Sequence, residues 1–539
     1  MAYKHGVYAV RTASQAKSAP QAEEVVLYVG TAPINLIRGY ADKDLVNSPV
    51  KVTTLADAYS KIGYSENWDD YSLNEAVDYH FNNTKHNIGP IYVINVLDPD
   101  THRKAAQTTK SVTFTAGKGS FASTTIILDT VAIAGKVEGT DFEIEYDMAT
   151  GTVTIDSSKA ETPLTGDVDV AFYEIDPTQV SSTDIIGTSN ADGSVTGLKA
   201  VKLLYQKYNA ITNIIVCPGY SQIPDVYKAM VSAAQKINNH WDAFVLADIP
   251  VSVSTTSYRE VTPAGTENPK EEGWYVVDDG EYVPTTDETV QGGTTYYEKV
   301  ITTTGIDTID KAKTWQAENG YTSEISKVFW PKLKNGEKVY HLSTVAAAQM
   351  LYIDDQHDAI PYVSASNHAV MATGQYFGEG VNNPGFDDQE ANSLNEVGIT
   401  TMAYWEGEWK LWGGHTAAYK YGASIDAAFI FDTNIRMLMY CTNGFQKRNA
   451  ADIDTPLTPA KKESIRIAEQ NELDILKSIG ALIGDPTCEF RSDENSTNDM
   501  LNGDFVWHIL VTVTPQMKSA TGKVTYTDEG FSALFGEEG

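Results

Sequence analysis

Apolar residues change their spacing several times along the chain, and each change predicts a different kind of element. Residues 25–30 form a short apolar run that ends in the Gly/Pro stop "GTAP", which predicts a buried strand. Residues 54–63 and 73–81 carry apolar side chains at helical spacing, the first behind a threonine suited to a helix N-cap. Residues 90–99 are nearly all apolar and predict another strand. This order predicts an α/β layer whose sheet is covered on both faces.

The middle of the chain alternates between β and α/β patterns. "SVTFTAG", "DFEIEYD" and "GTVTIDS" alternate apolar and polar residues between turns, which predicts a small all-β module over about 101–186. Helical spacing at 197–209 and 223–238, with the strands "NIIV" and "FVLAD", predicts a second α/β region. A β-meander at 271–300 interrupts this region before a helix at 309–319 and the strand "ISKVFWPKL". The two ends of that insertion must therefore lie close together.

The C-terminal part predicts two helices, a hairpin and a last strand. Helical spacing occurs at 343–353 and around 427–443, and between them a Gly/Asn-rich loop at 374–385 precedes a hairpin that turns at Glu406-Gly407. The segment "NGDFVWHILVTVTP" predicts a long strand.

A further helix begins at Thr458-Pro459, where a capping threonine and a first-turn proline give a strong start signal. Its predicted core-facing residues, interrupted by Glu472, are Ile465, Ala468, Leu476 and Ile479.

Both ends of the chain combine a strand-like run with a polar tether. Residues 6–10 are strand-like, and the polar stretch 11–22 separates them from the first buried strand. One strand cannot satisfy its own backbone groups, so we expect it to pair with a strand elsewhere. The chain has 72 acidic and 40 basic residues, which gives a net charge of −32. Its ends differ from the rest, because the first acid is Glu23, and residues 516–527 include basic residues and no acidic residue. Basic strand-like ends on an acidic body predict arms that dock on neighbouring copies.

Composition also limits the classes of function. The negative charge disfavours binding to nucleic acid and to anionic membranes. No apolar run approaches the roughly 18–20 residues of a membrane span, and a secretory signal is not expected. The cysteines Cys217, Cys441 and Cys488 are odd in number and widely spaced, which predicts neither a disulfide framework nor a metal site and indicates a reducing cytoplasm.

Three motifs could carry chemistry, but each has a simpler structural interpretation. "VCPGYS" around Cys217 lacks the spacing of a nucleophile elbow and fits a buried strand end. "DDQHD" around His357 could bind a divalent cation or be an acidic turn. The tryptophans at 405, 409 and 412 could bind a sugar or simply pack within the hairpin. We therefore assign no catalytic, cofactor-binding or metal-binding residue and predict that the chain is not an enzyme.

Several segments, in order, resemble the sheath proteins of contractile phage tails and related particles, particularly those of Gram-positive bacteria and their phages. They include "MAYKHGVY", "VGTAP", "GPIYVINVLDP", "LNEVGITTM", "KLWGGHTA", "IRMLMYCTNGFQ", "SIRIAEQNELDILKSIGALIG", "CEFRSDENSTNDMLNGDFVWHILVTVTP" and "YTDEGFSALFG". The resemblance covers about 1–99 and 343–539, and the insertion has no counterpart in it.

The resemblance implies an α/β (α+β) multidomain fold whose sheath core is built from N- and C-terminal segments, with a β-rich domain and an α/β domain inserted and strand arms at both ends. The implied division is an arm at 1–22, core at 23–98, a β-rich outer domain at 99–190, an α/β domain at 191–342 with a β insertion at 256–300, core at 343–520, and an arm at 521–539.

The resemblance also implies self-assembly into stacked hexameric rings around a tail tube, with a baseplate and a tail terminator as further partners. The subunits would assemble in the bacterial host cytoplasm, and contraction would drive the tube through the target envelope. We expect this chain neither to bind nucleic acid nor to insert into a membrane. A non-contractile structural tail protein and a tail-associated glycan-degrading enzyme are the alternatives; the enzyme would need paired carboxylates in a cleft.

Two groups of residues are the candidate interaction sites. The arms would pair with neighbouring subunits through Gly6, Val7, Tyr8, Ala9 and Val10 at one end and through Val524 and Tyr526 at the other. The bases near the start of the helix at 459 oppose the helix dipole, which suggests either an acidic partner or a solvated basic turn. Because C-terminal helices of sheath proteins line the inner wall, the expected tube-facing residues are Lys461, Lys462 and Arg466.

Overall fold

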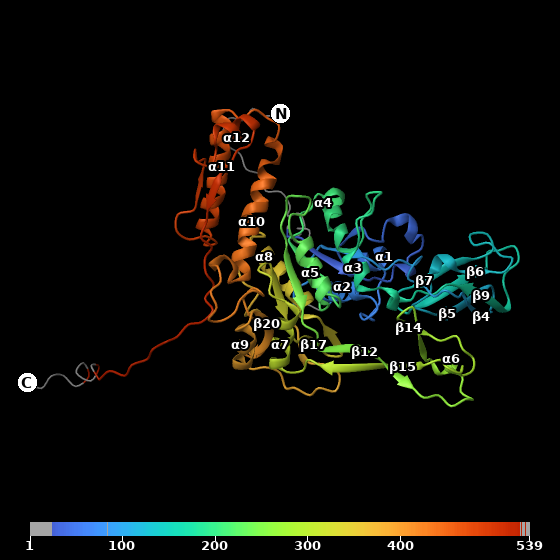
Figure 1. Cartoon of the computed structure of the whole chain (residues 1–539). Coiled ribbons are helices and arrows are strands. Elements are labelled where there is room, and N and C mark those ends of the chain that lie inside the picture. Colours follow the sequence, from blue (N-terminus) through green and yellow to red (C-terminus); the bar gives the residue numbers. More distant parts are fainter. Residues whose placement is uncertain (1–23, 83–84, 529, 531–533, 535–539) are drawn as a thin grey trace, which may run out of the picture. The chain divides into compact units, whose positions relative to one another are not determined.

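The computed structural model describes residues 24–82, 85–528, 530 and 534. The chain divides into two compact units, Met1–Thr455 and Pro456–Gly539 (Figure 1). The predicted N-terminal strand, Gly6 to Val10, lies outside the described residues.

In the described part of the first unit, the largest sheet has eight strands in the order β2, β3, β1, β10, β11, β16, β20, β21. The six central strands are parallel, and both edge strands are antiparallel to their neighbours. Leu27 of β1 lies opposite Tyr92 of β3 and Ile215 of β10. The strands are β1 (Val26–Gly30), β2 (Pro49–Val52), β3 (Ile91–Asn95), β10 (Ile214–Val216), β11 (Phe244–Asp248), β16 (Ser326–Phe329), β20 (Ile399–Trp405) and β21 (Glu408–Trp412).

This sheet joins segments that the sequence assigned to different domains. Strands β10, β11 and β16 come from 191–342, yet they pair in one sheet with β1 and β3 from 23–98. The expected separation of an α/β domain from the sheath core is therefore corrected to one continuous α/β layer. Every residue of β1, β3 and β11 is buried, as in a parallel sheet covered on both faces.

Two groups of helices cover the sheet. In one, α2 (Ser72–Asn82) packs on α8 (Leu342–Asp355), and in the other, α3 (Ser182–Ile186) and η5 (Gly197–Lys202) pack on α5 (Pro224–Ala233). Helices were predicted at these places except at α3, which lies in the stretch assigned to the all-β module. Thr54 caps α1 by accepting a 3.1 Å hydrogen bond from Asp57 N. The other helical elements are α1 (Leu55–Lys61), α4 (Leu203–Tyr208), α7 (Ile309–Asn319), α9 (Asp388–Asn395), α10 (Asp432–Asn449), and the short turns η1 (Ile34–Leu36), η2 (Tyr40–Lys43), η6 (Ala427–Phe429) and η7 (Ala450–Asp452).

A β-rich module lies within the stretch where the alternating pattern predicts one. Its two small sheets have the orders β4-β9-β6 and β5-β8-β7 and enclose an apolar cluster in which Phe121 stacks on Phe172. The elements are β4 (Thr108–Phe114), β5 (Lys118–Ala122), η3 (Leu128–Thr130), β6 (Ala132–Ile133), β7 (Glu143–Asp147), β8 (Thr152–Asp156), β9 (Gly166–Phe172) and η4 (Pro177–Gln179).

The insertion leaves and re-enters the α/β layer at adjacent points, as predicted. Its long strands β12 (Ser252–Val261) and β15 (Tyr296–Gly305) are antiparallel, and Ser252 lies opposite Gly305. The β structure thus begins at 252, before the expected 256. The remaining elements of its sheet and its short helix are β13 (Tyr275–Asp278), β14 (Glu281–Pro284) and α6 (Pro269–Glu272).

The predicted hairpin is present between β20 and β21. Its turn residues Glu406 and Gly407 both have positive φ, 53° and 85°, as a tight two-residue hairpin turn requires. The helix expected around 427–443 begins later, at Asp432, and continues to Asn449. A further small sheet contains β17 (Lys332–Asn335), β18 (Lys338–Tyr340) and β19 (Gly374–Tyr376).

The second unit contains the helix α11 (Pro459–Ser478), the strands β22 (Thr487–Glu489) and β23 (His508–Leu510), and α12 (Thr497–Asn502). The predicted helix start is confirmed, because Thr458 accepts a hydrogen bond from Lys461 N. The long terminal strand is not: β23 has three residues, and beyond it one isolated bridge joins Leu482 to Val513. A strand extends only as far as its partner, and β22 is equally short.

Candidate assembly surfaces

The small sheet of the second unit has the features of an incomplete sheet. Strands β22 and β23 pair antiparallel, with Cys488 opposite Ile509, and no third strand joins them among the described residues. A two-stranded sheet is marginally stable alone, and each outer edge presents unpaired backbone groups to a further strand. This sheet is therefore a candidate site for strand addition.

Gln470 of α11 closes one of the two edges. Its side-chain oxygen accepts from Cys488 N at 3.0 Å, and its side-chain nitrogen donates to Pro486 O at 2.9 Å. These backbone groups consequently point away from β23. Because backbone direction alternates along a strand, the N–H and C=O of Ile509, opposite Cys488, point away from β22. The outer edge of β23 is thus the available edge, and its centre is Ile509.

The C-terminal arm residues are placed in solvent. Val524 is 98% exposed and Tyr526 is 79% exposed, and residues 514–527 have neither helix nor strand. Such apolar side chains gain contacts only when another surface covers them. Their predicted counterparts Gly6 to Val10 lie outside the described residues.

The three predicted tube-facing bases share the first half of α11, but their surroundings differ. Arg466 makes a two-pronged ion pair with Glu463, with Nη2–Oε1 at 2.7 Å and Nε–Oε2 at 3.0 Å. That hydrogen bond lowers the pKa of Glu463. The Lys462 ammonium lies 4.9 Å from the centre of the Phe490 ring. The positive patch is thus partly neutralised within the subunit, which sequence spacing did not reveal.

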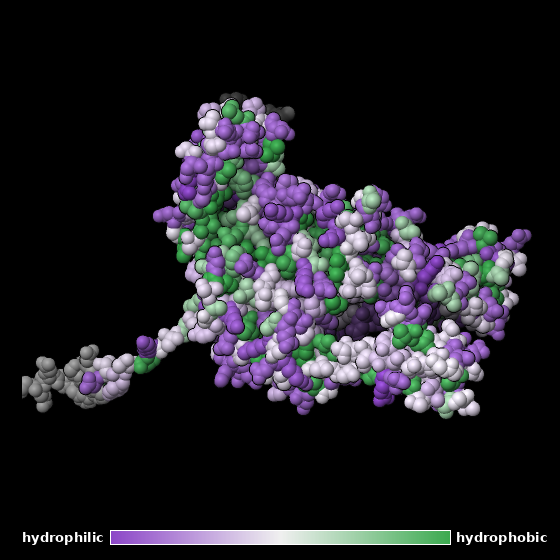
Figure 2. Space-filling model, viewed as in Figure 1, coloured by the Kyte–Doolittle hydropathy of each residue, from purple (hydrophilic) through white to green (hydrophobic). Residues whose placement is uncertain are grey.

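The buried face of α11 differs from the predicted stripe. Ile465 and Leu476 are buried as expected, whereas Ala468 and Ile479 are exposed. Glu469 and Leu473 complete the buried face. A second apolar row on the same helix, Ile467, Ile475 and Ile479, is 41–54% exposed, and apolar surface is visible on this unit in Figure 2. Two overlapping stripes at helical spacing made the assignment from sequence ambiguous.

A buried ionic cluster fixes the point where the N-terminal segment enters the first unit. Arg436 of α10 donates to Glu24 at 2.6 Å and forms an ion pair with Asp354 of α8. All three side chains are nearly inaccessible. Burial raises the pKa of Asp354. Burial alone would lower the pKa of Arg436, but the two carboxylates beside it outweigh this effect and raise that pKa. Asp354 belongs to the "DDQHD" motif, and its carboxylate is directed to Arg436.

Helix α10 is anchored at several further points. At its start, Asp432 accepts from the buried Lys327 of β16 at 2.5 Å, and burial lowers the pKa of that lysine. Farther along, Asn443 exchanges two hydrogen bonds with the backbone of Asp242, and Gln446 donates to His240 O at 2.9 Å. Polar contacts thus hold α10 against the sheet along its length.

The edge of the sheet where α/β proteins usually bind ligands is filled by protein groups. Asp248, at the carboxyl end of β11, accepts from Ser343 N at 3.0 Å and contacts the hydroxyls of Ser221 and Ser343. Burial raises the pKa of Asp248 and also that of the Cys217 thiol. Within the described residues, no group of three metal-binding side chains is present, and no helix is long and apolar enough to cross a membrane.

The tryptophans of the hairpin pack with one another and with neighbours. The rings of Trp405 and Trp412 are 5.9 Å apart, and Trp409 lies edge-on to Tyr404. Trp412 also donates to Asn392 of α9 at 3.0 Å. These contacts favour the packing interpretation over a sugar-binding platform.

Comparison with known proteins gives a consistent family. The chain is 23% identical over 557 residues to the tail sheath protein of Burkholderia phage BcepMu, covering 99% of both chains. It is also 23% identical over 244 residues to the major tail sheath protein of Serratia phage KSP20, covering 44% of this chain and 58% of that one. The chain is thus similar to tail sheath proteins along its whole length. No protein-family model matches it.

The fold is also similar to that of a solved structure. A chain in the structure of the anti-feeding prophage baseplate aligns with a TM-score of 0.52 at 12% identity, covering 98% of this chain and all of that chain. Both units thus lie within the aligned region. The finer prediction of a Gram-positive type stays a prediction. Sequence analysis missed Gln470 and the Glu24–Arg436 pair, because neither short-range spacing nor composition links residues 412 positions apart.

Proposed function

We propose that this chain is the structural subunit of a contractile tail sheath, which polymerises around a tail tube and shortens to drive the tube through the target envelope. The observation that carries the proposal is the similarity to a phage tail sheath protein over 99% of both chains. The subunits would form stacked hexameric rings on a phage tail or a phage-tail-like particle, assembled in the bacterial host cytoplasm. The tail tube, the baseplate and the tail terminator would be the other partners.

The available edge of β23 supports a specific mode of assembly. A terminal arm of one subunit would add a strand beside Ile509 of the next, the mode called β-augmentation. The arms would contribute through residues 6–10 and through Val524 and Tyr526. At about 0.5–1.5 kcal/mol net per hydrogen bond, the two backbone bonds of Ile509 contribute about 1–3 kcal/mol. One such link is weak, but a mesh of many links is strong and lets the bodies of the subunits rotate.

Contraction would be a collective change between two packings of the same subunit. The work would come from assembly of the subunits in the higher-energy packing, released when the baseplate changes state. The role of the subunit is therefore structural, not catalytic. The side chains around Asp248 fit this role, because they satisfy one another inside the protein instead of lining a cleft.

We also propose that Lys461, Lys462 and Arg466 face acidic groups of the tube. Replacing all three with Glu should leave the subunit folded and able to form tubeless polymer, while preventing extended sheath on purified tubes. Because Glu463 already neutralises part of Arg466, changing Arg466 alone should reduce coating less than the triple change. Normal coating of tubes by the triple variant, at both low and physiological salt, would exclude this orientation of α11.

The assembly proposal is tested by negative-stain microscopy of the purified protein. The intact chain should form hollow tubes or short rings. A variant lacking residues 1–22 should remain folded, because the buried strands begin at Val26, but should not polymerise. Hollow sheaths of normal length from this variant would contradict the role of the N-terminal arm, and glycan hydrolysis by the intact chain would contradict the structural role.

A further inference from the structure

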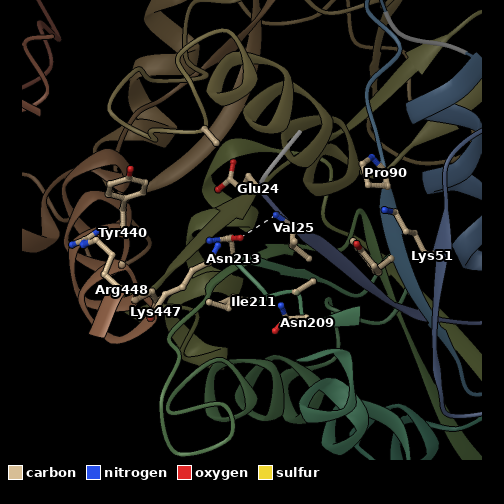
Figure 3. A pocket seen from close by; sticks show the side chains of 15 residues that line it. Glu24, Val25, Lys51, Pro90, Asn209, Ile211, Asn213, Tyr440, Lys447 and Arg448 are labelled. Atoms are coloured by element: carbon tan, nitrogen blue, oxygen red, sulfur yellow. Dashed lines mark hydrogen bonds between the residues drawn. The ribbon is translucent and has the colours of Figure 1, made fainter. Parts of the chain in front are cut away.

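A cavity of about 840 Å³ opens at the amino-terminal edge of the large sheet (Figure 3). Val25, Pro90 and Asn213, each directly before a strand, form one wall, and the second half of α10 forms another. The volume lies within the range of about 300–1,000 Å³ of small-ligand sites. Ligands of α/β enzymes bind at the opposite, carboxyl edge. The position of this cavity therefore favours a docking site over an active site.

The lining of the cavity is basic and apolar. Lys51, Lys447 and Arg448 contribute three positive charges. Among the described lining residues the one acid is Glu24, whose carboxylate is already bonded to Arg436. The apolar and aromatic lining residues include Val25, Ile211 and Tyr440 (Figure 3). On a chain of net charge −32, a lining that carries Lys51 and Lys447 beside apolar groups favours an acidic occupant with apolar side chains.

The C-terminal segment of this chain has that chemistry. Residues 524–539 contain four acids and no base, and the apolar side chains Val524, Tyr526, Phe531, Leu534 and Phe535 are interspersed among them. The described apolar residues of the segment are largely exposed, with Leu534 at 76%. The N-terminal segment enters beside the cavity at Glu24, but residues 1–22 carry bases and no acid and would be repelled.

We propose that the cavity binds the acidic C-terminal segment of a second copy of the chain. The proposal rests on the assembly function above and adds a site to it. The strand-like residues 521–527 would pair with the edge of β23, and the acidic end would then occupy the cavity. Two linked contacts on one arm raise the effective concentration of each for the other. Because the cavity contact is ionic, it should weaken as salt rises.

Cross-linking of the intact protein tests the occupant directly. Equal amounts of ¹⁵N-labelled and unlabelled chain are assembled together and treated with a carbodiimide, which joins amines to carboxylates. We expect mixed-label peptides that join Lys447 to an acid of residues 528–538. Same-label peptides alone, or the same links in unassembled protein, would show that the segment binds its own subunit and would overturn the proposal. Links from the tail acids only to other lysines would also overturn it.

Charge reversal provides the second test. Lys447→Glu with Arg448→Glu should abolish the cross-links through this helix end and raise the concentration needed for assembly by about tenfold or more, because favourable pairs become repulsive. Replacing the four tail acids of the same variant with Lys should restore assembly. Lys159→Glu with Lys420→Glu, two exposed lysines outside the cavity, is the matched control.

The outcomes separate this site from the function on which it rests. If the wild-type chain forms hollow sheaths and the Lys447/Arg448 variant assembles equally well, the cavity proposal fails while the sheath function stands. If the wild-type chain forms no sheath, the proposed function itself fails. A reversed variant that does not recover with the reversed tail, although its melting temperature is unchanged, would also contradict the cavity proposal.

Discussion

The substitution Ile509→Pro separates folding of the subunit from its assembly. The N–H of Ile509 points away from β22, so proline removes no bond of the β22–β23 ladder and is tolerated as on an exposed strand edge. An incoming strand, in contrast, loses a donor and meets the proline ring. If most of its contribution of about 1–3 kcal/mol is lost, the critical concentration for assembly rises about fivefold or more, at 1.4 kcal/mol per tenfold. Sedimentation of polymer across a dilution series measures this change.

Neighbouring substitutions make the test specific. Leu510→Pro removes an N–H that points toward β22 and should lower the stability of the second unit by about 1–3 kcal/mol. Ile509→Ala keeps the backbone donor and should assemble normally. Normal sheath formation by Ile509→Pro, at the wild-type critical concentration, would refute the assignment of this edge. Loss of the second unit's cooperative melting in Ile509→Pro would instead refute the deduced direction of the N–H group.

Three further substitutions test the fold of the first unit. Arg436→Met should lower the free energy of unfolding by about 3–5 kcal/mol, because it leaves two buried carboxylates facing each other. Arg259→Met, which removes an exposed ion pair with Glu298, should have little effect in the same denaturant titration. Replacing residues 257–300 with Asn-Gly should preserve folding and sheath formation, because Thr256 and Ile301 are cross-strand partners; insoluble protein would show that the insertion is part of the core. Burial lowers the pKa of His80 from 6.5 to about 4. The contribution of the neutral, buried imidazole to folding stability is therefore fully present above pH 6.5. About 3 kcal/mol of that stability is lost as pH falls through 4. His80→Gln should flatten this part of the stability–pH curve, and an unchanged slope would contradict the assignment.

Local signals predicted the elements of this protein well. The cap at Thr54 and the turn at Glu406-Gly407 depend on residues a few positions apart, so the sequence contains the whole interaction. The insertion was recognisable for a related reason, since an antiparallel pair such as Ser252 with Gly305 returns the chain to its starting point.

Long-range pairing was the part that the sequence did not predict. Parallel strands need crossovers, and a run such as "NIIV" is apolar on both faces whichever strand lies beside it. The continuous apolar composition of all these runs was the one signal that they form a single sheet. The available edge of β23 could not be predicted either, because it depends on Gln470, which closes the other edge of the sheet from a separate helix. Nothing in the sequence distinguishes this glutamine from any other glutamine in a helix.

The placement of buried charge suggests how the subunit transmits force. Arg436 and Lys327 form buried ion pairs that involve α10. Buried ion pairs add little net stability, but breaking one is costly, so they specify a single position where apolar packing would allow sliding. Helix α10 ends at Asn449, and the second unit, which carries the edge of β23, begins at Pro456. A helix held in one register is the connection that a pull from a neighbouring arm on that edge requires if it is to move the body of the subunit instead of distorting it.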